Sequence, residues 1–343
     1  MCHLLDLPEK FVTTNRTTMP KLEGLCLLIY CLSHPCRFKD LKLLFPRSEG
    51  ALSELFNCIL EYVYESWKHL LLFDHVRLSP QVLEEFAEAI HLKGGENSLD
   101  NCWAFLDGTH VRVCHPEVDQ EELYSGQKKC HTIKFQALTS PDGIIVHLGG
   151  PFSGRRHDAQ ILTMSKLLSF LHEHSVGVNG CVLVVYGDEG YARCAPVLAP
   201  FHGGEDPIEV AANEAMRRPR LCVEWAFAFI SNNWSFSNEC QKLRTRLMRV
   251  GMYYPVQAIL ANLQLCYDKN SSTRSFYQVA APTPEVYLMP RADWDVERVV
   301  MEQPDYFDLH FHNEEDDALQ LMQGGGEDAN QDADEDEEEA DHE

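Results

Sequence analysis

The sequence predicts an α/β fold in which a helical segment precedes a layered domain of strands and helices. Two observations carry this prediction: apolar residues recur at helical spacing in 51–70, and strand-like apolar runs begin at residue 99. The length of 343 residues suits one large domain and a smaller one. The predicted segments are a helical domain at 1–98, a layered domain at 99–270, an extension at 271–313 and a tail at 314–343.

Residues 20–92 are predicted to form helices. Apolar residues such as Leu52, Leu55 and Ile59 are spaced three and four apart, which marks a buried helical stripe. Two short helices followed by a longer one give the order of a helix-turn-helix. A DNA-reading role and a second interpretation, a helical packing collar for the following domain, both stay open, because most three-helix arrangements bind no DNA.

From residue 99 the pattern becomes typical of strands. Residues 103–106 and 110–114 are predicted to pair as a hairpin around an Asp107-Gly108 turn. The run at 181–186 is almost wholly apolar, as expected for a strand that is covered on both faces. The other predicted elements are strands at 132–138 and 144–148, a helix at 159–172 and a helix at 208–231 that is interrupted at Pro219.

The composition is that of an intracellular protein. No apolar run reaches the roughly 20 residues of a membrane span, and the N-terminus lacks the order of a signal peptide. The thirteen cysteines include no C-x-x-C pair, so reduced thiols are expected in place of a disulfide framework or a structural zinc site. We therefore expect a soluble protein that does not bind membranes.

The net charge of -24 is unevenly distributed along the chain. Residues 314–343 contain fifteen Asp or Glu and no Lys or Arg, which leaves about -9 for the rest. Such a tail is predicted to be disordered, and it is interpreted either as a solubilising tail or as a competitor for a basic groove or contact for a histone-like partner. Residues 217–249 carry seven basic and only two acidic residues, so the local charge permits DNA there.

Three acidic residues stand in unusual local settings. Asp107 ends one apolar run, Asp188 follows another, and Glu224 lies in an apolar stretch of helical character. A carboxylate at the end of a buried strand costs stability unless something pairs with it. Two strand ends and a helix carboxylate that converge on one spot would suit a divalent cation, which offsets their mutual repulsion.

Such a carboxylate cluster is the arrangement needed for metal-assisted attack on a phosphodiester. Water or a DNA 3'-hydroxyl attacks in line, with one metal ion at the nucleophile and a second about 4 Å away at the leaving oxygen. Magnesium prefers oxygen ligands and keeps several waters, so three carboxylates can serve two ions. Taken alone, each residue also has a structural explanation, as a turn Asp or as a helix Glu that pairs with Arg220.

Four segments then occur in a specific order: 106–110 (LDGTH), 154–158 (GRRHD), 187–191 (GDEGY) and Val223-Glu224. Together they resemble the DDE domain of PIF/Harbinger transposases and the nucleases derived from them, over roughly residues 100–270. The helical N-terminal region also resembles the helix-turn-helix of that family. The resemblance implies an RNase H-like fold with Asp107 on the first strand, Asp188 after the fourth and Glu224 on a later helix. It further implies that these three are catalytic ligands of Mg²⁺ or Mn²⁺.

The remaining site predictions concern a fourth carboxylate and the DNA contacts. Asp158 precedes the predicted helix at 159–172, where it would act as the helix N-cap, as a support of the ligands or as a direct metal ligand. The candidates for contacts to the DNA backbone are Lys128, Lys129, Lys134, Arg155, Arg156, Arg217, Arg218 and Arg220.

The predicted function is a metal-dependent DNA endonuclease of transposase type. The competing hypothesis is a domesticated, catalytically silent nuclear DNA-binding or adaptor protein that retains the fold. A nuclear location follows from either function. The resemblance also suggests a separate Myb-like DNA-binding partner, and homo-oligomerisation is left open.

Overall fold

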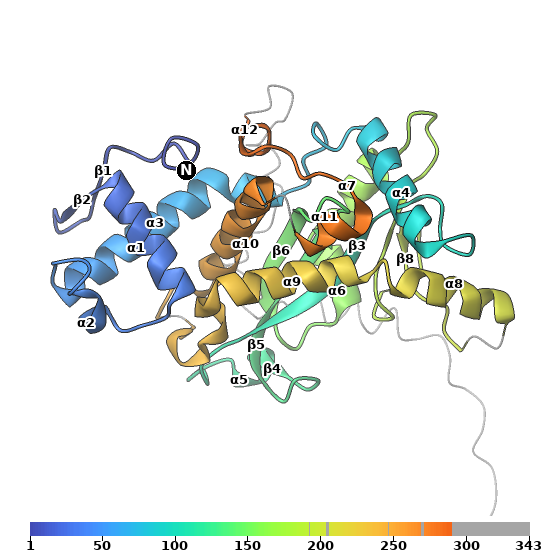
Figure 1. Ribbon diagram of the computed structural model, residues 1–343. Helices are drawn as coiled ribbons and strands as arrows, with labels where there is room; N and C mark the ends of the chain where they lie inside the picture. Colours follow the sequence, from blue (N-terminus) through green and yellow to red (C-terminus); the bar gives the residue numbers. More distant parts are fainter. Residues whose placement is uncertain (192, 204–205, 246, 269–270, 290–343) are drawn as a thin grey trace, which may run out of the picture. The chain divides into compact units, whose positions relative to one another are not determined.

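A mixed sheet is the centre of the fold in the computed structural model, which describes residues 1–289 except 192, 204–205, 246 and 269–270 (Figure 1). The predicted end of the extension, 290–313, and the acidic tail, 314–343, lie outside the described residues. The described residues fall within one compact unit. No helix among them has both the length and the apolar character needed to cross a membrane.

The sheet contains both parallel and antiparallel pairs. Its strands run in the order β6-β5-β3-β7-β8, and the short strand β4 also pairs with β5. β5 is antiparallel to β3 and β6, whereas β7 is parallel to β3 and β8. The strands are β3 (Cys102–Arg112), β4 (Tyr124–Ser125), β5 (Cys130–Thr139), β6 (Ile145–Ser153), β7 (Val184–Tyr186) and β8 (Val197–Leu198).

β3 is one continuous strand, so the predicted hairpin turn at Asp107-Gly108 is wrong. Asp107 pairs with Ala137 and Gly108 pairs with Gln136 in an unbroken antiparallel ladder. The local turn preference of an Asp-Gly pair is overridden because β3 has a partner strand on each side. The predicted strands that became β5 and β6 are confirmed, while β7 is shorter than the apolar run at 181–186.

The helices of the α/β part cover this sheet. α4, α9 and α11 pack against one another, and α4 and α9 also pack against β3. The residues between them form an apolar cluster that includes Phe105, Tyr186, Val223 and Tyr277. Part of the predicted extension is therefore core, because Tyr277 belongs to α11. The helices are α4 (Pro80–Gly94), α5 (Gln120–Leu123), α6 (Asp158–Met164), α7 (Leu167–His174), α8 (Pro207–Arg217), α9 (Leu221–Asn233), α10 (Val250–Tyr267), α11 (Ser272–Tyr277) and α12 (Pro284–Tyr287).

The helix predicted at 159–172 is two helices, α6 and α7, which is a correction. The chain bends between them at Lys166, whose φ of 55° is left-handed. Ser165, fully buried, ties the end of α6 to the sheet, because its hydroxyl donates to Gln136 Oε1 at 3.2 Å. A tertiary hydrogen bond that is absent from the local pattern thus interrupts the helix.

The N-terminal helices pack onto α10. The predicted stripe of α3 is confirmed, because Leu52, Leu55 and Ile59 are fully buried. Phe56 of α3 stacks on Tyr253 of α10 with ring centroids 6.2 Å apart. The elements of this region are β1 (Lys10–Val12), β2 (Thr18–Pro20), α1 (Lys21–Ser33), α2 (Phe38–Leu41), α3 (Glu49–Trp67) and three 3₁₀ turns at Lys68–Leu71, Ser235–Asn238 and Cys240–Lys242.

α10 is also fixed to the edge strand β6. The carboxamide of buried Asn262 accepts from the Ile145 N–H at 3.0 Å and donates to the Ile145 carbonyl at 2.9 Å. Phe135 of β5 stacks on Tyr254 of α10, with 4.9 Å between ring centroids. Because side chains alternate along a strand, Lys134 and Gln136 must then face the opposite side of β5, where α6 lies.

Buried His147 on β6 makes the fold sensitive to acid. Its side chain is fully buried, and neither ring nitrogen has a hydrogen-bond partner among the described residues. Burial lowers the pKa of His147 to about 4. Below pH 6.5 the unfolded chain therefore binds a proton that the native state refuses. The stability due to the neutral ring is present above that pH and is lost as pH falls toward 4.

We expect this residue to account for about 3 kcal/mol of lost stability between pH 7 and pH 4. The measurement is urea unfolding of the wild type and of His147→Leu at both pH values. The variant should lose clearly less stability on acidification than the wild type. An equal loss in the two proteins would show that His147 is not the group responsible.

Candidate active site

The site is built around Asp107, near the middle of β3. Its Oδ1 accepts a hydrogen bond from the Gly108 N–H at 2.8 Å. Burial raises the pKa of Asp107 to about 6, and the nearby carboxylates Asp188 and Asp158 raise it further, against the lowering effects of this hydrogen bond and of Arg220. A carboxyl with a raised pKa in a depression of the surface is a candidate functional group.

Asp188 lies beside Asp107 because β7 runs parallel to β3. Phe105 of β3 pairs with Tyr186 of β7, and each aspartate follows its paired residue by two positions. Residues two apart on a strand share a face, so the pairing directs both carboxylates to the face on which α9 packs. Burial raises the pKa of Asp188 as well, although its Oδ1 accepts from the Gly190 N–H at 3.0 Å.

Glu224 lies on the same face, in the first turn of α9. Its side chain is about half exposed, at 49%. Its Oε1 is 3.5 Å from the Arg220 guanidinium, which confirms the structural explanation of a helix Glu paired four positions back. The same guanidinium lies 3.5 Å from Asp107 Oδ2. Arg220 thus stands between the helix carboxylate and the strand carboxylate.

Asp158 approaches from the other face of the sheet. Its Oδ1 is 2.8 Å from Lys134 Nζ, and the Lys134 side chain is only 5% exposed. A Cβ placed on Gly108 would lie 2.6 Å from the same oxygen, and one on Gly190 would lie 3.4 Å from Oδ2. The two glycines therefore leave room for this carboxylate at the strand ends.

The predicted N-cap role of Asp158 is a correction, because the N-cap of α6 is His157. The His157 N–H receives support from Gln160, whose Oε1 accepts from it at 3.2 Å. Asp158 is instead the first residue of the helix, where a carboxylate interacts favourably with the helix dipole. Its pairing with Lys134 fits a residue that supports the neighbouring carboxylates.

Oxygen ligands are the only donors that this site offers. Three aspartates and one glutamate suit Mg²⁺ or Mn²⁺, and the raised pKa values of Asp107 and Asp188 show that negative charge is crowded here. Within the described residues, no three His, Cys, Asp or Glu side chains are grouped closely enough to hold a metal ion. The donor chemistry therefore fits a divalent cation, while the metal-ligand roles of the four residues stay predictions.

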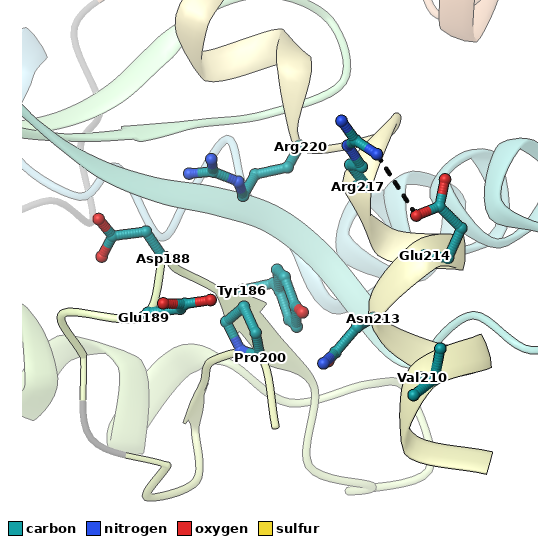
Figure 2. A pocket seen from close by; sticks show the side chains of 9 residues that line it. All are labelled: Tyr186, Asp188, Glu189, Pro200, Val210, Asn213, Glu214, Arg217 and Arg220. Atoms are coloured by element: carbon teal, nitrogen blue, oxygen red, sulfur yellow. Dashed lines mark ion pairs between the residues drawn. The ribbon is translucent and has the colours of Figure 1, made fainter. Parts of the chain in front are cut away.

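A cavity of about 480 Å³ opens next to Asp188 (Figure 2). Its rim carries both signs of charge, from Asp188 and Glu189 on one side and Arg217 and Arg220 on the other. Arg217 is already paired, 3.6 Å from Glu214. The lining residues are Tyr186, Asp188, Glu189, Pro200, Val210, Asn213, Glu214, Arg217 and Arg220.

The predicted DNA contacts differ in accessibility. Lys134 is buried and paired with Asp158, so its ammonium lies within the site and not on a surface open to DNA. Arg220 is half-buried and paired with two carboxylates. Arg156 is also partly buried. The exposed candidates are Lys128, Lys129, Arg155, Arg217 and Arg218.

Sequence analysis missed the role of Lys134 and a polar pair beside it. Gln136 Nε2 donates to the Tyr191 hydroxyl at 3.0 Å, and both side chains are buried. The available signal was the presence of Lys134 and Gln136 two positions apart in an otherwise apolar strand. Such residues are buried only with partners, so they indicate the face that carries polar chemistry.

The raised pKa of Asp107 predicts that this carboxylate destabilises the metal-free fold. The native state keeps the proton up to about pH 6, whereas the unfolded chain releases it near pH 4. Stability therefore falls as pH rises between these values, and the full penalty is present above pH 6. Asp107→Asn should remove it and stabilise the protein by roughly 1–3 kcal/mol at pH 7.5 but not at pH 4.

The test is thermal unfolding with EDTA at pH 7.5 and pH 4. Asp100→Asn is the control, because Asp100 is an exposed aspartate just before the start of β3. The control should match the wild type at both pH values. An Asp107→Asn protein that is less stable than the wild type at pH 7.5 would contradict the prediction.

Residues 106–262 match the model of the DDE superfamily endonucleases. The matched segment contains Asp107, Asp158, Asp188 and Glu224, together with the strands that position them. No curated protein and no solved structure matches the chain. The match supports a transposase-derived DDE nuclease domain on a mixed α/β fold.

Proposed function

We propose that the protein is a divalent-metal-dependent DNA endonuclease or strand transferase of PIF/Harbinger type. The observation that carries the proposal is the parallel pairing of β3 and β7, which directs Asp107 and Asp188 to one face of the sheet. Glu224 reaches that face from α9, within a segment that matches DDE endonucleases. Asp107, Asp188 and Glu224 are proposed as the metal ligands and catalytic residues.

The chain's own residues prepare the site for two ions. When bound, Mg²⁺ or Mn²⁺ supplies Lewis acidity at the scissile phosphate and lowers the pKa of the attacking water. Asp107 and Asp188 provide carboxylates whose burial favours neutralisation by a cation. Lys134 holds Asp158 against the strand ends, where Asp158 supports the ligands or joins them. Arg217 and Arg218 are exposed on the same side as α9 and are proposed to contact phosphates.

An RNase H-like topology is part of the proposal. Leaving aside the two-residue β4, Asp107 is on the first strand of the sheet and Asp188 follows the fourth, β7. The strand order β6-β5-β3-β7-β8, with its one antiparallel hairpin, supports this assignment. DNA as the substrate, a nuclear location, a Myb-like partner and an N-terminal helix-turn-helix belong to the same proposal.

A second candidate function is a catalytically silent DNA-binding or adaptor protein. The observation that favours it is the position of Arg220, whose guanidinium already neutralises Asp107 and Glu224. If this pairing were permanent, the fold would retain its carboxylates without holding metal.

Cleavage of supercoiled plasmid separates the two functions. We expect the full chain to nick or linearise plasmid DNA with Mn²⁺ or Mg²⁺ and to be inactive with EDTA, because the site offers only oxygen ligands. Calcium is a useful control, since it accepts the same ligands but tolerates looser geometry. Absence of cleavage with every divalent ion, while DNA is still bound, would favour the silent protein.

A further inference from the structure

We propose that Arg220 is an internal counter-cation of the site: it holds Asp107 and Glu224 together in the metal-free protein and releases both when a divalent ion binds. This inference rests on the proposed function, because it concerns the same carboxylates. It assigns Arg220 a positioning role in place of the predicted DNA contact.

The geometry places one guanidinium between two elements. One terminal nitrogen is 3.5 Å from Asp107 Oδ2 on β3, and the other is 3.5 Å from Glu224 Oε1 on α9. These distances are longer than the roughly 2.7–2.9 Å of a strong charge-assisted hydrogen bond. Arg220 therefore neutralises both carboxylates while binding neither tightly, as expected of a cation that can be exchanged.

The backbone delivers this side chain from a fixed corner. Arg220 is the N-cap residue of α9, and its N–H donates to the Met216 carbonyl at 3.1 Å. The preceding carbonyl, that of buried Pro219, accepts a hydrogen bond from the Tyr277 hydroxyl. The corner between α8 and α9 is thus held by the core, and only the side chain of Arg220 is free to change position.

Space for the released side chain is already present. Arg220 lines the cavity of about 480 Å³ beside Asp188, and Figure 2 shows its side chain on the Asp188 side while Arg217 points toward Glu214. A guanidinium that moves into this cavity stays at the edge of the site. There it can meet a phosphate of bound DNA, which replaces the lost carboxylate partners.

The two neighbouring arginines provide a matched comparison. Arg217 and Arg220 both line the cavity, but Arg217 pairs with Glu214, which lies outside the carboxylate cluster. A counter-cation competes with metal for the same oxygens, so its removal should tighten metal binding. A nearby arginine of equal charge that does not touch those oxygens should have little effect.

The experiment is Mn²⁺ titration of the full, DNA-free chain, followed by the electron paramagnetic resonance of free Mn²⁺. Arg220→Gln, which removes the charge, should bind Mn²⁺ about 3–10-fold more tightly than the wild type, since two ion pairs of modest strength no longer oppose binding. Arg220→Lys, which keeps the charge, and Arg217→Gln should stay within about twofold of the wild type. Circular dichroism confirms that each variant is folded.

The outcomes distinguish this inference from the proposed function. Tighter binding in Arg220→Gln alone, including binding that appears only in that variant, supports the counter-cation. Equal or weaker binding in Arg220→Gln, or equal tightening in Arg220→Lys, overturns it while leaving a metal-binding site. If no variant and no wild type bind Mn²⁺, the proposed metal-dependent function fails, and the counter-cation fails with it.

Discussion

Replacing Asp188 by Asn is expected to reduce metal-dependent DNA cleavage on the order of 10³-fold, because loss of one ligand removes several kcal/mol of charge stabilisation at the phosphate. Asp188 is the ligand whose role depends most directly on the topology, since the parallel pairing of β7 with β3 places it beside Asp107. The substitution preserves the size of the side chain and its ability to accept the hydrogen bond from the Gly190 N–H.

The readout is the initial rate of plasmid nicking with Mn²⁺ at equal protein concentration. Asp100→Asn, before the start of β3, should cleave at the wild-type rate. DNA binding of Asp188→Asn, measured separately with EDTA, should be nearly unchanged, because phosphate contacts come from basic residues. Cleavage within tenfold of the wild type would show that Asp188 is not an essential ligand.

Replacing Lys134 by Met is expected to destabilise the protein by about 3 kcal/mol and also to slow cleavage. The substitution leaves the Asp158 carboxylate without its ammonium partner in a site where the lysine is 5% and the aspartate 24% exposed. Breaking one side of a buried ion pair is costly, because the remaining charge is uncompensated. Asp158 would then shift away from Gly108 and Gly190, which it now approaches closely.

A double-mutant cycle isolates this pair. Lys134→Met, Asp158→Asn and the double variant are compared by urea unfolding, and the double variant should be more stable than the sum of the single losses by about 1–3 kcal/mol. Lys128→Met is the control, because Lys128 is an exposed lysine of the loop before β5 and its loss should change stability by less than about 0.5 kcal/mol. Additive losses would mean that the two side chains do not stabilise each other.

Several elements could be predicted because their patterns are strong. The stripe of α3 places its buried residues at helical spacing, and the pair β5–β6 flanks a turn of favourable residues. Asp107, Asp188 and Glu224 could be singled out because each interrupts or ends an apolar run. In each case the local sequence and the tertiary structure favour the same conformation.

Other features depend on contacts between distant segments. Asp107-Gly108 has the composition of a turn, but pairing on both sides of β3 keeps it extended. Lys134 has the composition of a surface residue, but its partner Asp158 comes from another element. Arg220 could be assigned to Glu224 by helical spacing, whereas its second partner, Asp107, belongs to a strand more than a hundred residues earlier.

The central claim is that Asp107, Asp188 and Glu224 together hold divalent ions. Anomalous X-ray scattering from crystals of the full chain grown with Mn²⁺ and a short DNA duplex tests it most directly. The account predicts Mn²⁺ peaks within about 2–2.5 Å of carboxylate oxygens of Asp107 and Asp188, with Glu224 turned toward them and Arg220 displaced from both partners. Fully occupied Mn²⁺ peaks found only elsewhere, with Arg220 still between Asp107 and Glu224, would contradict it.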